Sequence, residues 1–122
     1  MTALETVKAF LNAVAVKDFD TALTHVTPSC EYHNMMMDKA IGPSDIREQL
    51  EPFFEPTQEN ELTILNSMSD GRTVFVERLD RHLMDYGWAE LPVTGVWEVE
   101  DGKICSVREY FDLQTLMRQI PA

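Results

Sequence analysis

The second half of the chain is a series of strand-like segments joined by very short turns. The segments are 59–68, 73–83, 88–100 and 103–111, and the turns are Asp70-Gly71, Asp85-Tyr86-Gly87 and Asp101-Gly102. Turns this short join only antiparallel neighbours, because parallel strands need a long crossover. The pattern therefore predicts four consecutive antiparallel strands, and Pro92 marks an edge or a bulge in the third of them.

The first half and the last residues predict helices. A capping box of Thr2 and Glu5 precedes an apolar stripe with helical spacing. A short second helix begins at Asp18, and Ser44 is the expected N-cap of a third helix, which Pro52 ends or bends. The remaining expected elements are a strand over 30–36 and a closing helix over 113–120.

This order of elements predicts an α+β fold. Strands joined by tight turns form one sheet, and the helices gather on one of its faces. We expect a strongly curved, mixed but mainly antiparallel sheet that wraps over the N-terminal helices and encloses a pocket. With 122 residues, the chain is expected to be a single domain over residues 1–122.

Charge and composition exclude several classes of partner. The net charge of -11 argues against nucleic acid and against anionic membranes, which both need an excess of Lys and Arg. No basic leader or long apolar run is present, which predicts a cytoplasmic protein. Cys30 and Cys105 lack the spacing of a metal site, so we expect two buried free thiols and no metal.

Polar side chains occupy positions that alternation assigns to inward faces. Arg78, Asp80 and His82 share a face with Val74 and Val76. Taken alone, Arg78 and Asp80 are more typical of an exposed ion pair that contributes little. His82 fits an additional acid or base, or a hydrogen-bonded residue at the pocket rim or in the core.

A carboxylate in the last strand changes this interpretation. Glu109 lies between Val107 and Phe111 on an apolar face, where a carboxylate needs a partner. The guanidinium of Arg78 can bind two carboxylates through its planar fork, so it is the expected partner of both Asp80 and Glu109.

An ordered set of short stretches resembles the limonene-1,2-epoxide hydrolase family, a branch of the ketosteroid-isomerase-like (NTF2-like, SnoaL-like) fold group. The resemblance covers residues 30–115. The matching stretches are Tyr32-His33-Asn34, Val76-Glu77-Arg78-Leu79-Asp80, Gly95-Val96-Trp97 with Gly102-Lys103-Ile104, and Arg108-Glu109-Tyr110-Phe111-Asp112.

The resemblance implies a role for each polar residue. Tyr32 and Asn34 would hold a water molecule, and Arg78 would bridge the two carboxylates. Asp80 would give a proton to the epoxide oxygen, and Glu109, where the family usually has Asp, would take a proton from the water. Such a reaction needs no cofactor, no metal and no covalent intermediate.

The function expected on these grounds is hydrolysis of a small apolar epoxide to a vicinal diol. The residues expected to line the substrate pocket are Val76, His82, Leu91, Val93, Val107 and Phe111. Each apolar member of that set is equally compatible with a place in the core. The alternatives are a ketosteroid-isomerase-like isomerase, a SnoaL-like cyclase and a non-catalytic small-molecule binder, because one fold hosts all of them.

The outer face of the sheet predicts a homodimer. Phe75, Leu79 and Leu83 share that face, together with a tryptophan, either Trp88 or Trp97, and such a face is too apolar for open solvent. Besides a second copy of itself, the only expected partner is a small hydrophobic epoxide.

Overall fold

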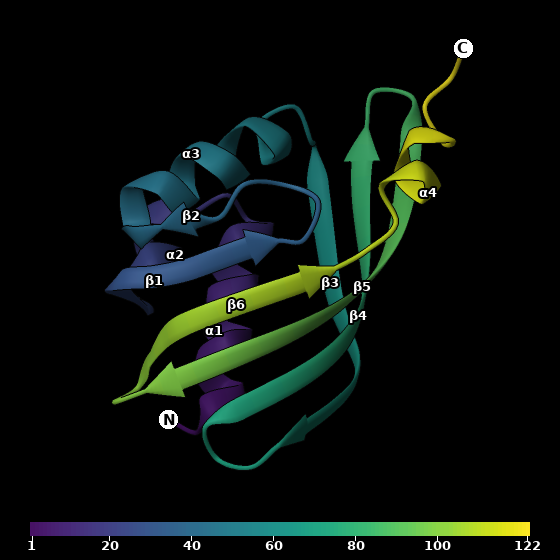
Figure 1. Ribbon diagram of the computed structural model, residues 1–122. Coiled ribbons are helices and arrows are strands. Elements are labelled where there is room, and N and C mark those ends of the chain that lie inside the picture. Colours follow the sequence, from purple (N-terminus) through teal and green to yellow (C-terminus); the bar gives the residue numbers. More distant parts are fainter.

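The computed structural model describes residues 1–122 and confirms the α+β fold (Figure 1). It contains four helices and one six-stranded sheet. The helices are α1 (Ala3–Ala15), α2 (Phe19–Leu23), α3 (Gly42–Phe54) and α4 (Leu113–Met117). The strands are β1 (Val26–Asn34), β2 (Ala40–Ile41), β3 (Glu59–Ser69), β4 (Thr73–Met84), β5 (Gly87–Glu100) and β6 (Lys103–Tyr110).

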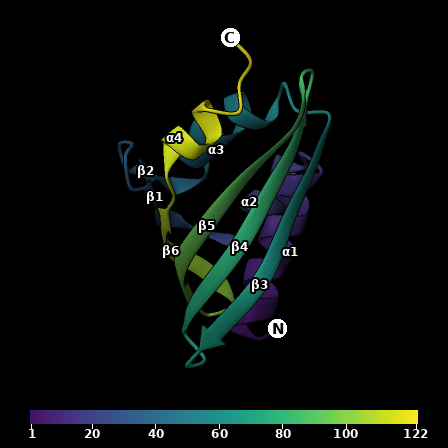
Figure 2. The same ribbon diagram turned by 90° about the vertical axis from the view of Figure 1, so that its right-hand side faces the viewer.

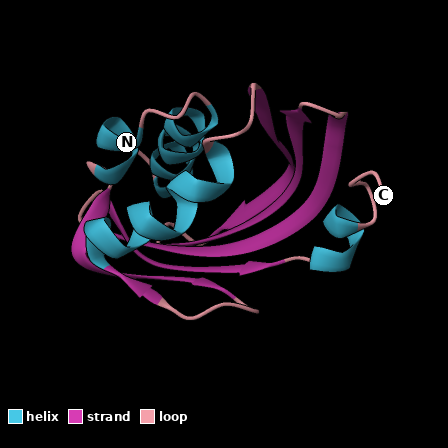
Figure 3. Ribbon diagram, turned by 90° about the horizontal axis from the view of Figure 1, so that it is seen from above, coloured by secondary structure: helices cyan, strands magenta, loops and turns pink.

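The sheet is mixed and strongly curved. Its strand order is β2-β1-β6-β5-β4-β3; β1 and β6 pair in parallel, and every other pair is antiparallel. The long strands β3, β4 and β5 lie side by side and twist together (Figure 2). Seen from above, the sheet curls around the N-terminal helices, which occupy its concave side (Figure 3). This arrangement agrees with the predicted cone.

Helix α1 supplies the centre of the core. Thr2 and Glu5 form the predicted capping box, which fixes the start of the helix. The apolar stripe of the helix packs on the sheet, where Phe10 meets Trp97 edge to face with 5.5 Å between ring centroids. Trp97 is fully buried, so it belongs to the core and not to the outer face of the sheet.

The third helix differs from the prediction at both ends. It begins at Gly42, Ile41 is its N-cap without a side-chain hydrogen bond, and Ser44 lies in the first turn. Gly42 has a φ of +83°, and a Cβ there would lie 2.7 Å from the carbonyl oxygen of Pro28, so only glycine fits. Pro52 lies inside the helix, which continues to Phe54, so this proline does not end it.

The first strand also starts earlier than predicted. It includes Pro28, which is tolerated because the β1–β6 pairing is interrupted between Val26 and Glu31. The strand ends at Asn34, and the methionines that follow form a turn. Strand β2 was not expected, and the closing helix α4 is shorter than its predicted range.

Strand β5 has a free edge along half of its length. Strand β6 stops at Tyr110, which lies opposite Thr94, so the part of β5 before Thr94 pairs only with β4. Pro92 lies in this part, which agrees with the predicted edge position. The side chain of Gln119 covers the edge: its Nε2 donates to Glu90 O, and its Oε1 accepts from Glu90 N, both at 2.7 Å.

The prediction of two buried thiols is correct for Cys30 and wrong for Cys105. Cys30 is fully buried, whereas Cys105 is half-buried, and its Sγ contacts Glu98 O at 3.4 Å. A bulge where Glu98 and Val99 pair with β6 shifts the alternation, so Ile104 turns inward instead of Cys105. No helix in the structure combines the length and the apolar character that crossing a bilayer requires.

Candidate active site

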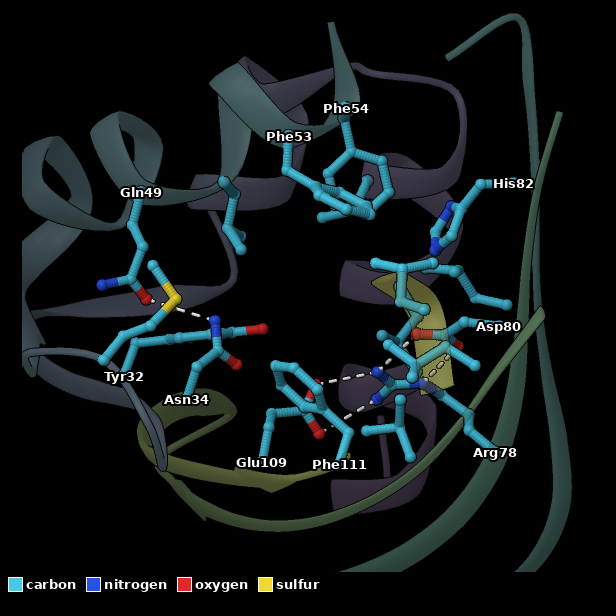
Figure 4. A pocket seen from close by; sticks show the side chains of 18 of the residues that line it. Tyr32, Asn34, Gln49, Phe53, Phe54, Arg78, Asp80, His82, Glu109 and Phe111 are labelled. Carbon is cyan, nitrogen blue, oxygen red and sulfur yellow. Dashed lines mark hydrogen bonds and ion pairs between the residues drawn. The ribbon is translucent and has the colours of Figure 1, made fainter. Parts of the chain in front are cut away.

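A cavity of about 190 Å³ lies between the concave face of the sheet and the helices. Most of its lining is apolar, with 15 hydrophobic residues among 21. Helix α3 contributes Phe53 and Phe54, and helix α4 contributes Leu116 (Figure 4 shows the residues of α3). A few polar side chains converge on this apolar space, which is the usual composition of a small-molecule site.

Arg78 binds both carboxylates, as predicted. Its Nε and Nη2 donate to Asp80 Oδ1 and Oδ2 at 2.8 and 3.0 Å. Its Nη1 and Nη2 donate to Glu109 Oε2 and Oε1 at 3.2 and 2.8 Å (Figure 4). All three residues are buried, so the alternative of an exposed ion pair is wrong. The cluster holds one positive charge against two carboxyl groups.

Burial and mutual charge shift the pKa values of this cluster. Burial raises the pKa of Glu109, and the charge of Arg78 opposes that effect only in part. Burial disfavours the charged guanidinium of Arg78, but Glu109 and Asp80 outweigh it and raise its pKa, so it stays protonated. Burial, and then the charge of Glu109, raise the pKa of Tyr32 well above its ordinary value, so its hydroxyl keeps its proton.

The parallel pairing of β1 with β6 brings Tyr32 and Asn34 to the cluster. In this register Asn34 lies opposite Glu109, and Tyr32 lies opposite Val107. The ring of Tyr32 is fixed by Trp97 and Phe10, each 6.2 Å away between centroids. All five residues assigned to catalysis from the sequence therefore line one cavity.

Gln49 is a site residue that the sequence analysis missed. Its Nε2 donates to the backbone oxygen of Asp38 at 2.9 Å, and its Oε1 accepts from Asn34 Nδ2 at 3.3 Å. Because a carbonyl oxygen only accepts, Asp38 sets the orientation of the Gln49 amide, which in turn sets that of Asn34. Asn34 thus keeps its Oδ1 free to accept another hydrogen bond. The sequence signal is weak, since Gln49 is simply a polar residue next to Leu50 on the buried side of α3.

Gly95 makes room for the carboxyl group of Glu109. A Cβ at this position would overlap Glu109 Oε2 and lie 2.6 Å from Trp97 Nε1. Two polar groups, Glu109 Oε2 and Trp97 Nε1, therefore already fill the space over Gly95. Trp97 Nε1 is buried there without a hydrogen-bond partner in the chain. Gly95 was noted only as part of the family resemblance, and its role as a spacer required the tertiary structure.

Two of the six predicted pocket residues belong elsewhere. Val76 and Val107 are each 1% exposed and pack in the core cluster that contains Phe10. They share the inner face with Arg78 and Glu109 as predicted, but α1 covers that part of the sheet, and the cavity begins only at the charged residues. His82, Leu91, Val93 and Phe111 do line the cavity.

The loop after β1 supplies part of the cavity wall. Met36 and Met37 line the cavity and remain 47% and 46% exposed. They therefore lie at its border with solvent, where an unbranched, adaptable side chain suits a lip.

Comparison with known proteins agrees with this geometry. The family model of the limonene-1,2-epoxide hydrolase catalytic domain matches residues 1–122. The epoxide hydrolase EphG of Mycobacterium tuberculosis is 30% identical over 112 residues, which cover 92% of this chain and 74% of EphG.

Solved structures show the same relationship. One is an epoxide hydrolase of M. tuberculosis that resembles limonene-1,2-epoxide hydrolase. It superposes on this chain with a TM-score of 0.79 at 30% identity, and the match covers 93% of this chain and 85% of the other. A putative SnoaL-like polyketide cyclase of Shewanella denitrificans reaches a TM-score of 0.86 at 14% identity, with 95% and 94% covered, which shows a shared fold. The chain belongs to the limonene-1,2-epoxide hydrolase catalytic domain family.

Proposed function

We propose that the protein adds water to an apolar epoxide and releases a vicinal diol. The observation that carries this proposal is the buried Arg78, which holds Asp80 and Glu109 while Tyr32 and Asn34 lie beside Glu109. Opening an epoxide needs a base for the water and an acid for the departing oxygen, and this cluster has a carboxyl group for each task.

In the proposed reaction, Glu109 acts as the base. Tyr32, Asn34 Oδ1 and the ionised Glu109 hold a water molecule, and Glu109 accepts one of its protons as the oxygen attacks a ring carbon. The bond between the epoxide oxygen and that carbon breaks, and the epoxide oxygen takes a proton from Asp80. A proton then returns from Glu109 to Asp80 through water, which restores the starting state.

The assignment of base and acid rests on position. Asn34 is the neighbour of Glu109 in the β1–β6 ladder, whereas Asp80 lies on β4, on the other side of Arg78 (Figure 4). The raised pKa of Glu109 also suits a base, because a base works best when its pKa approaches the working pH.

Arg78 keeps the two carboxyl groups in fixed positions. Its four hydrogen bonds use both oxygens of each group, so neither carboxyl group rotates freely. Such positioning of reacting groups is a large part of catalysis, and a displacement of about 1 Å can cost ~10²-fold in rate.

The shape of the cavity supports a small hydrophobic substrate. Phe53, Phe54 and Leu50 from α3 form part of the apolar wall, and Leu91 and Val93 on β5 lie beside Asp80 and Arg78. An apolar epoxide gains affinity from these contacts, while its single oxygen is directed to Asp80.

The experiment is a substrate panel with matched variants. Styrene, cyclohexene and limonene-type epoxides are incubated with the protein, and the diol is measured by gas chromatography. Asp80→Asn and Glu109→Gln should each lose at least ~10²-fold in turnover. Glu77→Gln, on the outer face of the same strand as Asp80, should keep the full rate.

Two outcomes would overturn this proposal. A folded Asp80→Asn or Glu109→Gln protein with the wild-type rate would remove that residue from the mechanism. If the wild-type protein forms no diol from any epoxide, an isomerase, a cyclase or a non-catalytic binder on the same fold replaces the hydrolase.

A further inference from the structure

His82 is a buried side chain of the cavity wall that has no task in the proposed reaction. It follows Asp80 on the inner face of β4 and is 2% exposed (Figure 4). The edges of Phe53 and Phe54 hold its ring, with centroid distances of 4.9 and 5.6 Å. The ring is therefore fixed in position next to the acid of the proposed reaction.

A chain of hydrogen bonds behind His82 fixes the orientation of Asn60. Thr57 Oγ1 donates its only hydrogen to Phe54 O at 2.6 Å. Asn60 Nδ2 donates to Thr57 Oγ1 at 2.8 Å and to Ala15 O at 3.2 Å. The backbone oxygens of Phe54 and Ala15, which only accept, anchor this series of hydrogen bonds. The amide nitrogen of Asn60 must therefore face Thr57 and Ala15, and its Oδ1 must face His82.

The orientation of Asn60 determines which ring nitrogen of His82 carries the hydrogen. His82 Nδ1 lies 2.7 Å from Asn60 Oδ1 and must donate to it. Burial lowers the pKa of His82, so the ring is neutral and Nε2 has a free lone pair. Nε2 has no hydrogen-bond partner in the chain, and the neighbouring Asp80 accepts its hydrogen bonds from Arg78.

We propose that His82 Nε2 accepts a hydrogen bond from the substrate and selects epoxides that carry a second polar group, a hydroxyl or an amide N–H. This inference rests on the proposed function of the same cavity. Residues two apart on one face of a strand lie about 6.6 Å apart. With the epoxide oxygen at Asp80, a donor about five bonds away along an open chain reaches His82.

The kinetic test compares two epoxides that differ only in this donor. One is an open-chain epoxy alcohol whose hydroxyl oxygen is about five bonds from the epoxide oxygen, and the other is its methyl ether. The wild-type protein should prefer the alcohol by roughly 10-fold in kcat/KM, and the difference should lie in KM because the bond exists before the reaction. His82→Leu should lose the preference, so that its kcat/KM becomes the same for the alcohol and the ether.

Matched variants separate this role from a structural one. His82→Gln keeps a donor for Asn60 and an acceptor for the cavity, so it should retain part of the preference. His33→Leu, which removes a half-exposed imidazole from a different surface pocket, should behave like wild type. An equal loss of kcat on both substrates in His82→Leu would assign His82 to proton transfer and overturn the proposal, as would an unchanged preference.

A binding measurement distinguishes failure of this inference from failure of the proposed function. Cyclohexanol and methoxycyclohexane are titrated into the protein labelled with ¹⁵N-histidine. The Nε2 resonance of His82 should be that of an unprotonated nitrogen and should move toward the protonated range with cyclohexanol only. This result supports the inference even if no epoxide is opened, and a hydrogen found on Nε2 refutes it.

Discussion

Replacing Gly95 by alanine tests how closely the position of Glu109 governs the reaction. Gly95 has no positive φ, so the backbone accepts alanine without strain. The added Cβ would lie 2.6 Å from Trp97 Nε1 and 3.3 Å from Glu109 Cδ, and it would overlap Glu109 Oε2. Both contacts are shorter than a Cβ tolerates, so the indole of Trp97 and the carboxyl group of Glu109 must both shift, and the carboxyl group, which overlaps the Cβ most, must shift further.

The size of the effect follows from the displacement. To reach an ordinary contact distance, Oε2 must retreat by about 1 Å, and a shift of this size costs ~10²-fold in rate. The same shift weakens the 3.2 Å hydrogen bond from Arg78 Nη1. We therefore expect Gly95→Ala to fold with reduced stability and to form diol about 10²-fold more slowly.

A second substitution provides the decisive control. Aspartate is one methylene shorter than glutamate, so Glu109→Asp withdraws the carboxyl group from the space that the new Cβ takes. The double variant Gly95→Ala, Glu109→Asp should therefore be faster than Gly95→Ala alone. Thr94→Ala, on the outer face of the same strand, controls for a general effect on β5.

The assay is diol formation from one accepted epoxide, with folding checked by circular dichroism and urea unfolding. If Gly95→Ala keeps the wild-type rate, or if the double variant is slower than the product of the two single effects predicts, the spacer role of Gly95 is refuted.

Three further predictions concern pH, the thiols and the oligomeric state. Because burial raises the pKa of Glu109 above its ordinary 4.5, the acid limb of kcat should lie above pH 4.5. The folded chain then binds this proton more tightly than the unfolded chain does, so the free energy of unfolding should fall as pH rises through the raised pKa. Urea unfolding at several pH values measures this fall, and Glu109→Gln should remove it. Burial raises the pKa of Cys30 to about 12, so iodoacetamide should label the half-buried Cys105 first, as mass spectrometry of the native protein would show; labelling of Cys30 first would contradict the packing. We also propose a homodimer through the outer sheet face, where Phe75 is 53% exposed and Trp88 is 38% exposed; light scattering should give twice the chain mass, Phe75→Glu should lower it, and a monomeric wild type would contradict the proposal.

The alternation within β4 was enough to predict the inner face of the site. A period of two fixes which side chains share a face, so Arg78, Asp80 and His82 were placed together from the sequence alone. The same rule does not give the depth of each residue in the fold. Val76 and Val107 lie on the predicted faces, but the packing of α1 determines that they belong to the core.

Features that depend on a second segment could not be predicted. The bulge that turns Cys105 outward arises from the pairing of β5 with β6, which local alternation does not report. Gln49 acquires its role from a carbonyl in the loop between β1 and β2 and from an amide on β1. The spacer role of Gly95 depends on side chains from β5 and β6 that meet only in the folded sheet.

The parallel pairing of β1 with β6 has a consequence for how the protein folds. Strands β3 to β6 are joined by short turns, so these hairpins form through local contacts, which is fast. The ladder that places Asn34 against Glu109 closes a loop containing most of the chain, which is entropically costly and slow. The complete site, with Tyr32 and Asn34 beside the cluster of Arg78, Asp80 and Glu109, therefore assembles late in folding, and during synthesis it cannot form until the last strand has left the ribosome.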